Sequence, residues 1–183
     1  MLLTHLHADH VGGLIDGDDQ AVFPNATLMV PAPELDYWTG AAADGLPESR
    51  QKHVAASKRA LAQYAGRVQA VDEGEVLPGI TLVSLPGHTP GHAGYLIESN
   101  GEQLLIWGDI VHLPQIQLPH PQAGVIFDVE PDVALQTRLE LFERLDRERL
   151  LIAGMHLDFP GIGHIVRDGE GYRFLPHVWQ PTI

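Results

Sequence analysis

The sequence predicts an α/β protein in which sheets and helices form layers within a single domain. Short apolar runs bounded by turn residues alternate with two longer amphipathic segments, and no internal repeat, linker or low-complexity tract separates them. The length of 183 residues suits about one domain, and 44% hydrophobic with 19% charged residues is an ordinary globular composition. We therefore expect residues 1–183 to form one layered domain.

The first part of the chain is expected to contain two strands and two helices. Residues 2–4 have the pattern of a strand end, and residues 26–30 form an apolar strand flanked by prolines. Residues 33–38 predict a short helix with a proline near its start. Residues 49–64 predict an amphipathic helix, because their apolar side chains recur at helical spacing before Gly66.

Short strands dominate the centre of the chain. Turn residues separate four apolar runs, which are residues 68–71, 80–85, 94–97 and 103–107. The sequence Asn100-Gly101 lies between the last two runs and is typical of a hairpin turn. We therefore expect these two runs to pair as an antiparallel hairpin.

The last third of the chain contains the clearest helix signal. A proline opens residues 131–145, and the apolar side chains of this segment share one face. Residues 150–153 follow as a buried strand. Residues 167–175 predict a closing hairpin around Asp168-Gly169.

The charge balance disfavours some classes of partner. Eleven Lys and Arg against 24 Asp and Glu give a net charge of −13, which argues against a nucleic-acid surface and an anionic membrane. No apolar run approaches the ~18 residues of a membrane span, and no secretory signal is visible. The absence of cysteine excludes disulfides, thiolate metal sites and a Cys nucleophile. We expect a cytoplasmic protein that acts on a small-molecule substrate.

Histidine is abundant, with 11 residues, as many as Lys and Arg together. His5, His7, Asp9 and His10 follow the first apolar run directly. Residues two apart in an extended segment face the same side, so His5 and His7 can grip one ion, whereas Asp9 and His10 follow a turn and face a neighbouring position. Imidazole and carboxylate suit zinc and similar divalent ions. The alternative is a chance cluster of surface residues, which this density of ligands disfavours.

Three further candidate ligands come from elsewhere in the sequence. His88, Asp109 and His156 each follow a predicted strand and lie within two residues of a glycine that lets the backbone approach the site. Ligands from one short loop cannot complete two coordination spheres, so partners of this kind are required. We expect these side chains to meet at one end of the strands.

Taken together, these residues resemble the signature of the metallo-β-lactamase superfamily, His-x-His-x-Asp-His followed by single His, Asp and His ligands. The resemblance runs from Leu2 to about Ile165 and implies an α/β fold, a four-layer αββα sandwich with the metals between two sheets at one edge. It implies a first metal site of His5, His7 and His88, and a second of Asp9, His10 and His156, with Asp109 bridging both.

The resemblance implies two divalent ions, with zinc as the first choice and manganese, iron or cobalt as alternatives. Two ions that share a water lower its pKa from 15.7 toward ~7, which provides a bridging hydroxide as the nucleophile. Asp9 is the candidate catalytic side chain, because it can shuttle a proton as well as ligate. The segments around Asp109 and His156 resemble the methyl parathion hydrolase and quorum-quenching lactonase group, which implies ester, lactone or phosphotriester substrates.

Other side chains are expected to surround the metals. The candidate substrate contacts are His112, His164 and Phe159. His92 is expected to hydrogen-bond behind the ligands or to anchor a loop. His53 is expected to be a solvated or capping residue, and Trp38 and Phe127 are expected to pack in the core or to form a pocket wall.

Two alternative functions stay open. The same scaffold carries mononuclear-iron dioxygenases and other redox enzymes, although the complete second-site set argues against them. The other alternative is a truncated metal-binding protein with little or no catalysis, because only four residues precede His5 where family members carry several strands. This departure predicts an N-terminally shortened fold, and we expect its exposed sheet edge to form a homo-oligomer.

Overall fold

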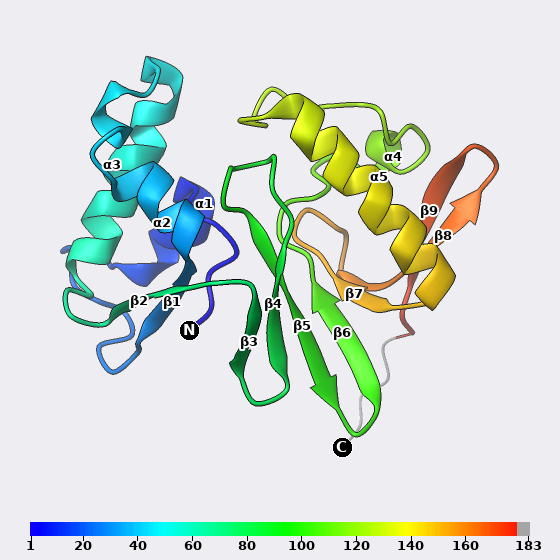
Figure 1. Cartoon of the computed structure of the whole chain (residues 1–183), viewed down its shortest axis with the longest axis horizontal. Helices are drawn as coiled ribbons and strands as arrows, with labels where there is room; N and C mark the ends of the chain where they lie inside the picture. The colour runs from blue at the N-terminus through cyan, green and yellow to red at the C-terminus, as the bar shows by residue number, and fades with distance from the viewer. Residues whose placement is uncertain (179–183) are drawn as a thin grey trace.

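The computed structural model describes residues 1–178, which form two sheets packed between helices (Figure 1). The predicted domain of residues 1–183 extends over 179–183, which lie outside the described residues. One apolar cluster joins helices α2 (Ala32–Thr39) and α3 (Glu48–Ala62) to the smaller sheet. A second cluster lies between the sheets, and a third joins the larger sheet to helix α5 (Pro131–Glu148). This order of layers confirms the four-layer αββα prediction.

The smaller sheet pairs β1 (Leu28–Pro31) with β2 (Val68–Val71) in parallel, and α2 and α3 lie between them in the sequence. A parallel pair needs such a crossover, and its helices bury the outer face of the sheet. The predicted strand of residues 26–30 and both predicted helices are confirmed, with boundaries shifted by one or two residues. Residues 2–4 contribute only an isolated bridge between Leu2 and Met29.

The larger sheet has seven strands in the order of the sequence. They are β3 (Gly74–Leu77), β4 (Ile80–Ser84), β5 (Ala93–Ser99), β6 (Glu102–Ile106), β7 (Leu151–Ala153), β8 (Ile162–Asp168) and β9 (Gly171–Pro176). All neighbours are antiparallel except β6 and β7. Both predicted hairpins are confirmed. Strand β3 was not predicted, because it contains no fully buried residue and begins within a segment of turn composition.

Helix α5 connects the parallel strands β6 and β7 and covers the sheet (Figure 1). Phe142 and Leu145 on its inner face are fully buried against Trp107 and Ile152. The prediction of this helix is confirmed, and it continues three residues beyond the predicted end at Leu145, as far as Glu148. Within residues 1–178, every helix lacks either the length or the apolar character that crossing a bilayer requires.

The direction of three strands determines where the loops gather. Strand β6 is parallel to β7 and, through the shared antiparallel neighbour β5, runs in the same direction as β4. The carboxyl ends of these strands therefore lie at one edge of the sheet. The loops that follow them carry His88, Asp109 and His156.

Candidate metal centre

The N-terminal histidines lie where an extended segment turns into a short helix. His5 and His7 are buried in the extended part, and α1 (Ala8–Val11) begins directly after His7, whose ψ of 154° is extended. Asp9 and His10 lie on α1 and present their side chains from one helical turn. This geometry agrees with the prediction that the two pairs face neighbouring positions.

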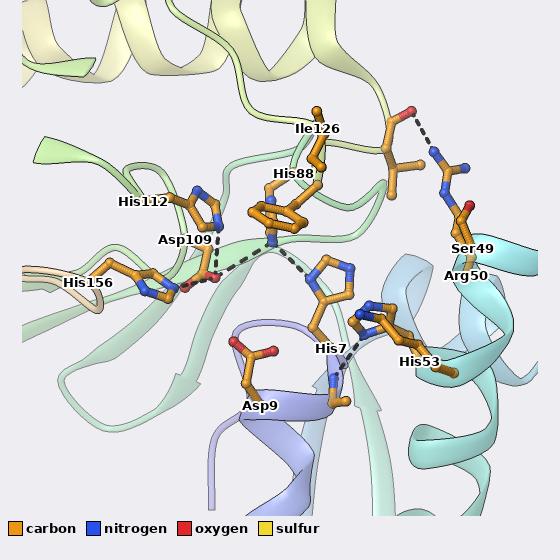
Figure 2. Close-up of a pocket in the computed structure, with 14 residues that line it drawn as sticks. His7, Asp9, Ser49, Arg50, His53, His88, Asp109, His112, Ile126 and His156 are labelled. Carbon is orange, nitrogen blue, oxygen red and sulfur yellow. Dashed lines mark hydrogen bonds and ion pairs between the residues drawn. The ribbon is translucent and has the colours of Figure 1, made fainter. Parts of the chain in front are cut away.

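The remaining ligand candidates reach the same place from the strand ends (Figure 2). Asp109 is buried directly after Gly108, which has a φ of +62°. A Cβ atom at Gly108 would clash with the His92 ring, so both the dihedral and the close packing require glycine here. The sequence thus brings Asp109 to the centre of the histidines.

The candidate side chains form three groups, and within each group the possible ligand atoms lie within 4.8 Å of one another. The first group is His5, His7 and His88, and the second is Asp9, His10, Asp109 and His156. The third group, His88, Asp109 and His112, overlaps both of the others. Asp109 Oδ2 lies 3.8 Å from His5 Nε2 and 3.6 Å from His88 Nε2. It also lies 3.1 Å from His156 Nε2, while Asp109 Oδ1 lies 3.2 Å from His10 Nε2. Asp109 therefore lies between the first group and the other side chains of the second group.

The donor atoms of this cluster suit bound cations. His5 Nε2 and Asp109 Oδ1 are buried and have no hydrogen-bond partner among the described residues. His7 Nδ1 and His88 Nε2 lie 2.9 Å apart and form a hydrogen bond when one of the two nitrogens carries the proton. Unpaired buried polar atoms are costly, and divalent ions among these atoms would satisfy all of them. The residues present therefore fit a pair of metal ions.

The protonation states favour ligation. Burial, followed by the charge of His92, holds the pKa of His5 well below its ordinary value, and burial lowers the pKa of His7 to about 2. Burial alone would raise the pKa of Asp109, but the neighbouring rings of His10 and His112 outweigh it and keep the pKa well below the usual range. The rings of His5 and His7 are therefore neutral and the Asp109 carboxylate is ionised at neutral pH, as metal ligands must be. Burial opposes the charged form of His10, but the neighbouring Asp109 carboxylate outweighs it and raises the pKa of that ring.

Two buried residues orient ligands from behind. Asp128 Oδ1 lies 3.0 Å from His88 Nδ1, and Arg138 on α5 lies 3.6 Å from the other oxygen of Asp128. A His88 ring that donates from Nδ1 leaves Nε2 free for a metal, so Asp128 selects the required tautomer. His92 accepts the backbone N–H of Asp109 at 2.9 Å and donates from Nδ1 to the Leu85 carbonyl at 2.7 Å. The prediction that His92 anchors the loop behind the ligands is confirmed.

His92 makes the metal-free protein sensitive to acid. Burial lowers the pKa of His92 to about 4, whereas the unfolded chain has the ordinary value of about 6.5. Stability from this group is therefore complete above the unfolded value and is lost as the pH falls toward 4, by up to about 3 kcal/mol. We expect chelator-treated wild type to lose stability over this pH range in denaturant titrations. His92→Gln removes this titration, so an identical loss in that variant would contradict the assignment.

A buried carboxylate joins the two loops that carry the first ligand group. Glu34 on α2 is fully buried. Its Oε1 accepts the Leu6 N–H at 2.9 Å and the Trp38 indole N–H at 2.5 Å. Its Oε2 accepts the Thr89 hydroxyl at 2.6 Å and the Gly91 N–H at 3.1 Å. Glu34 thus fixes the loop of His5 and His7 against the loop of His88.

We expect Glu34→Gln to lower the free energy of unfolding by about 3 kcal/mol, because the new amide NH₂ faces two donors that Glu34 accepts. Denaturant unfolding measures this change. Glu170→Gln, an exposed position in the β8–β9 turn, is the matched control and should stay within about 0.5 kcal/mol of wild type. Equal stability of the two variants would show that Glu34 does not hold the loops together.

The ligand cluster opens into a cavity of about 620 Å³. One wall comes from α3 and is polar, with Ser49, Arg50, Lys52 and His53. The opposite wall is apolar, with Ile126, Phe127 and Val129. The floor holds His7, Asp9, His88, Asp109, His112 and His156 (Figure 2).

Of the three candidate substrate contacts, one lines the cavity and two do not. His112 lines the cavity, and its Nε2 lies 3.2 Å from Asp109 Oδ2. His164 lies within β8, and its Nδ1 is 3.2 Å from the Leu150 carbonyl. Phe159 is 83% exposed and lines a separate groove of about 310 Å³ beside β9. Neither His164 nor Phe159 lines the cavity of the cluster, which corrects the expectation that they contact substrate there.

Sequence reasoning missed several residues around the site. No sequence pattern marks Glu34, Asp128 or Arg50 as part of the site. Each of them lies far in the sequence from the groups that it contacts. The structure assigns His53 both a capping contact and a position in the cavity wall. Trp38 is a buried core residue, and Phe127 is the aromatic side chain that reaches the cavity.

A comparison of sequences finds lactonases among the relatives. An N-acyl homoserine lactonase from Bacillus thuringiensis is 26% identical over 178 residues, which is 96% of this chain and 59% of the relative. The chain therefore spans about three fifths of the length of this relative.

Two solved structures share the fold. The hydrolase AbOPH in the β-lactamase superfamily superposes with a TM-score of 0.90 at 36% identity, covering 98% of this chain and 64% of that one. AidC, a dizinc quorum-quenching lactonase in complex with a product, gives a TM-score of 0.88 at 28% identity with the same coverage. Residues 1–156 match the family described as Metallo-beta-lactamase superfamily. The ligand pattern, the layered fold and this match agree, and the chain belongs to the metallo-β-lactamase superfamily.

Proposed function

We propose that the protein is a dinuclear metal-dependent hydrolase that cleaves an ester, lactone or phosphotriester bond of a small-molecule substrate. The observation that carries this proposal is the convergence of two ligand groups on the single buried carboxylate of Asp109. The relative from Bacillus thuringiensis is an N-acyl homoserine lactonase, and AidC is a dizinc lactonase, which supports the same reaction class here.

Zinc is the proposed metal, since histidine and carboxylate are its ordinary ligands in catalytic sites. The first ion would be held by His5, His7 and His88, and the second by Asp9, His10 and His156, with Asp109 between them. When bound, such a pair supplies an acidified water as nucleophile and polarises the carbonyl or phosphoryl oxygen that is attacked.

The chain itself supplies proton transfer and substrate contacts. The side chain of Asp9 is 61% exposed and lines the cavity floor, so its carboxylate is accessible to a proton released near the centre. We assign Asp9 the role of holding and returning that proton to the leaving group. His112 lies beside Asp109 at the cavity floor, where it can hydrogen-bond the substrate.

The cavity supports a substrate of modest size with an apolar part. Its volume of about 620 Å³ lies within the ordinary range of small-molecule sites. Ile126 is 94% exposed and Phe127 is 57% exposed, so the wall opposite α3 offers apolar surface to a ligand. An aliphatic or aromatic substituent of the substrate would bury this surface.

A substrate panel with metal quantitation tests the proposal. We expect zinc-loaded protein to hydrolyse at least one lactone, aryl ester or phosphotriester above background, and chelated protein to hydrolyse none. Bound zinc with no turnover across the panel, including β-lactams, would instead indicate a metal-binding protein without catalysis. Colour, one iron per chain and oxygen uptake with a persulfide would indicate the redox alternative.

A further inference from the structure

One ring nitrogen of His53, a residue of α3, hydrogen-bonds to α1, the helix that carries Asp9 and His10. Its Nδ1 lies 3.1 Å from the backbone nitrogen of Ala8, the first residue of α1. The first amides of a helix have no partner within the helix, and His53 satisfies this one across 45 residues of sequence. The contact fixes the orientation of the ring relative to the ligand cluster.

This contact also determines which nitrogen carries the proton. A backbone N–H can only donate, so Nδ1 of His53 must be the acceptor and carry no hydrogen. A neutral ring with a bare Nδ1 has its hydrogen on Nε2. No hydrogen-bond partner of that Nε2 occurs among the described residues.

The ring of His53 lies in the cavity wall next to the first ligand group. Its centroid is 4.2 Å from that of His7, and both residues line the cavity (Figure 2). The neighbouring Arg50 is already engaged, because its guanidinium donates to the Tyr37 hydroxyl at 2.9 Å and to the Val129 carbonyl at 3.3 Å. On the α3 wall, His53 is therefore a donor of fixed orientation whose N–H is free for a ligand.

We propose that His53 Nε2–H donates a hydrogen bond to a second oxygen of the substrate, outside the scissile bond, and so selects substrates with an acyl carbonyl on the α3 side. This proposal rests on the proposed hydrolase function. The ligand groups meet at Asp109, where the scissile group would lie, whereas the ring of His53 packs against His7 of the first group. The apolar remainder of the substrate would then face Ile126 and Phe127.

Two substitutions distinguish the role of the Nδ1 acceptor of His53 from that of its Nε2–H donor. In His53→Asn, the amide oxygen takes the place of Nδ1, which keeps the acceptor for Ala8 and removes the donor in the cavity. In His53→Gln, the amide NH₂ takes the place of Nε2–H, which keeps the cavity donor and removes the acceptor for Ala8. If His53 only caps α1, His53→Gln should lower kcat/KM more than His53→Asn does. If His53 recognises substrate, His53→Asn should lower kcat/KM more for the substrate with the acyl carbonyl.

The test compares two lactones with zinc-loaded protein: one with an α-acylamino chain, and one with an α-alkyl chain of the same length. We expect His53→Asn to lower the ratio of kcat/KM for the acylamino lactone to that for the alkyl lactone about tenfold, through the KM of the acylamino lactone. His53→Gln keeps the cavity donor, so this ratio should stay within about threefold of the wild-type ratio, whatever the loss of the Ala8 contact does to both substrates together. Equal effects of His53→Asn on both lactones, or no effect on either, would overturn the proposal.

Failure of the proposed hydrolase function can be distinguished from failure of the proposed role of His53. If wild type turns over neither lactone, the hydrolase proposal fails, and the recognition by His53 is measured as binding of an N-acyl amino acid to zinc-loaded protein by calorimetry. Recognition still requires an affinity loss of about tenfold in His53→Asn and a near-native affinity in His53→Gln. Equal affinities of wild type and His53→Asn would overturn it.

Discussion

Replacing Asp109 with asparagine is expected to lower kcat/KM by about 10³-fold or more and to remove about one metal ion per chain. Asparagine keeps the size of the side chain but has neither the charge nor the second oxygen. Asp109 Oδ2 lies near His5, His88 and His156, and Oδ1 lies near His10, so both oxygens are required where the ligand groups meet. Metal content and turnover on the best substrate of the panel measure the two effects together.

The matched control for this substitution is Asp72→Asn, which makes the same chemical change at an exposed position after β2. We expect this variant to keep the metal content and activity of wild type. If Asp109→Asn also retains both ions and wild-type turnover, Asp109 does not link two metal sites, and the proposed centre is wrong.

Removal of the metals is expected to have the second-largest effect. The cluster leaves buried donor atoms of His5 and Asp109 without hydrogen-bond partners among the described residues, so the protein without ions carries a cost that binding relieves. Two ions at about 100 times their dissociation constants together stabilise the folded state by about 5 kcal/mol. We expect a chelator to lower the melting temperature by about 15 °C and added zinc to restore it.

The Asp109→Asn variant provides the control for that measurement. Because it should bind fewer ions, its melting temperature should fall less on chelation than that of wild type. A wild-type melting temperature that chelation does not change would mean that the histidine cluster binds no stabilising metal.

The parts of the site that could be predicted from sequence are those encoded locally. His5, His7 and His10 lie within one short segment, so the spacing and the turn after His7 determine their geometry. Asp109 and His156 could be predicted because each follows an apolar strand, and strands of like direction end at one edge of a sheet. The oligomeric state, by contrast, stays a prediction.

The parts that could not be predicted depend on tertiary contacts. Glu34 and His53 act on loops that lie 28 or more residues away in the sequence, and only the packing of α2 and α3 reveals these contacts. Phe159 was expected at the cavity because it follows His156 closely, but sequence proximity does not determine which way a loop turns. Strand β3 escaped prediction because half-buried side chains give a weak apolar pattern.

Anomalous diffraction at the zinc edge, with metal quantitation on the same preparation, shows whether two metal ions bind at Asp109. We predict about two ions per chain and two anomalous peaks that flank the Asp109 carboxylate. One peak should contact His5, His7 and His88, and the other should contact Asp9, His10 and His156. Crystals soaked in zinc that show no peak among these side chains, or protein with less than about one ion per chain, would contradict the account.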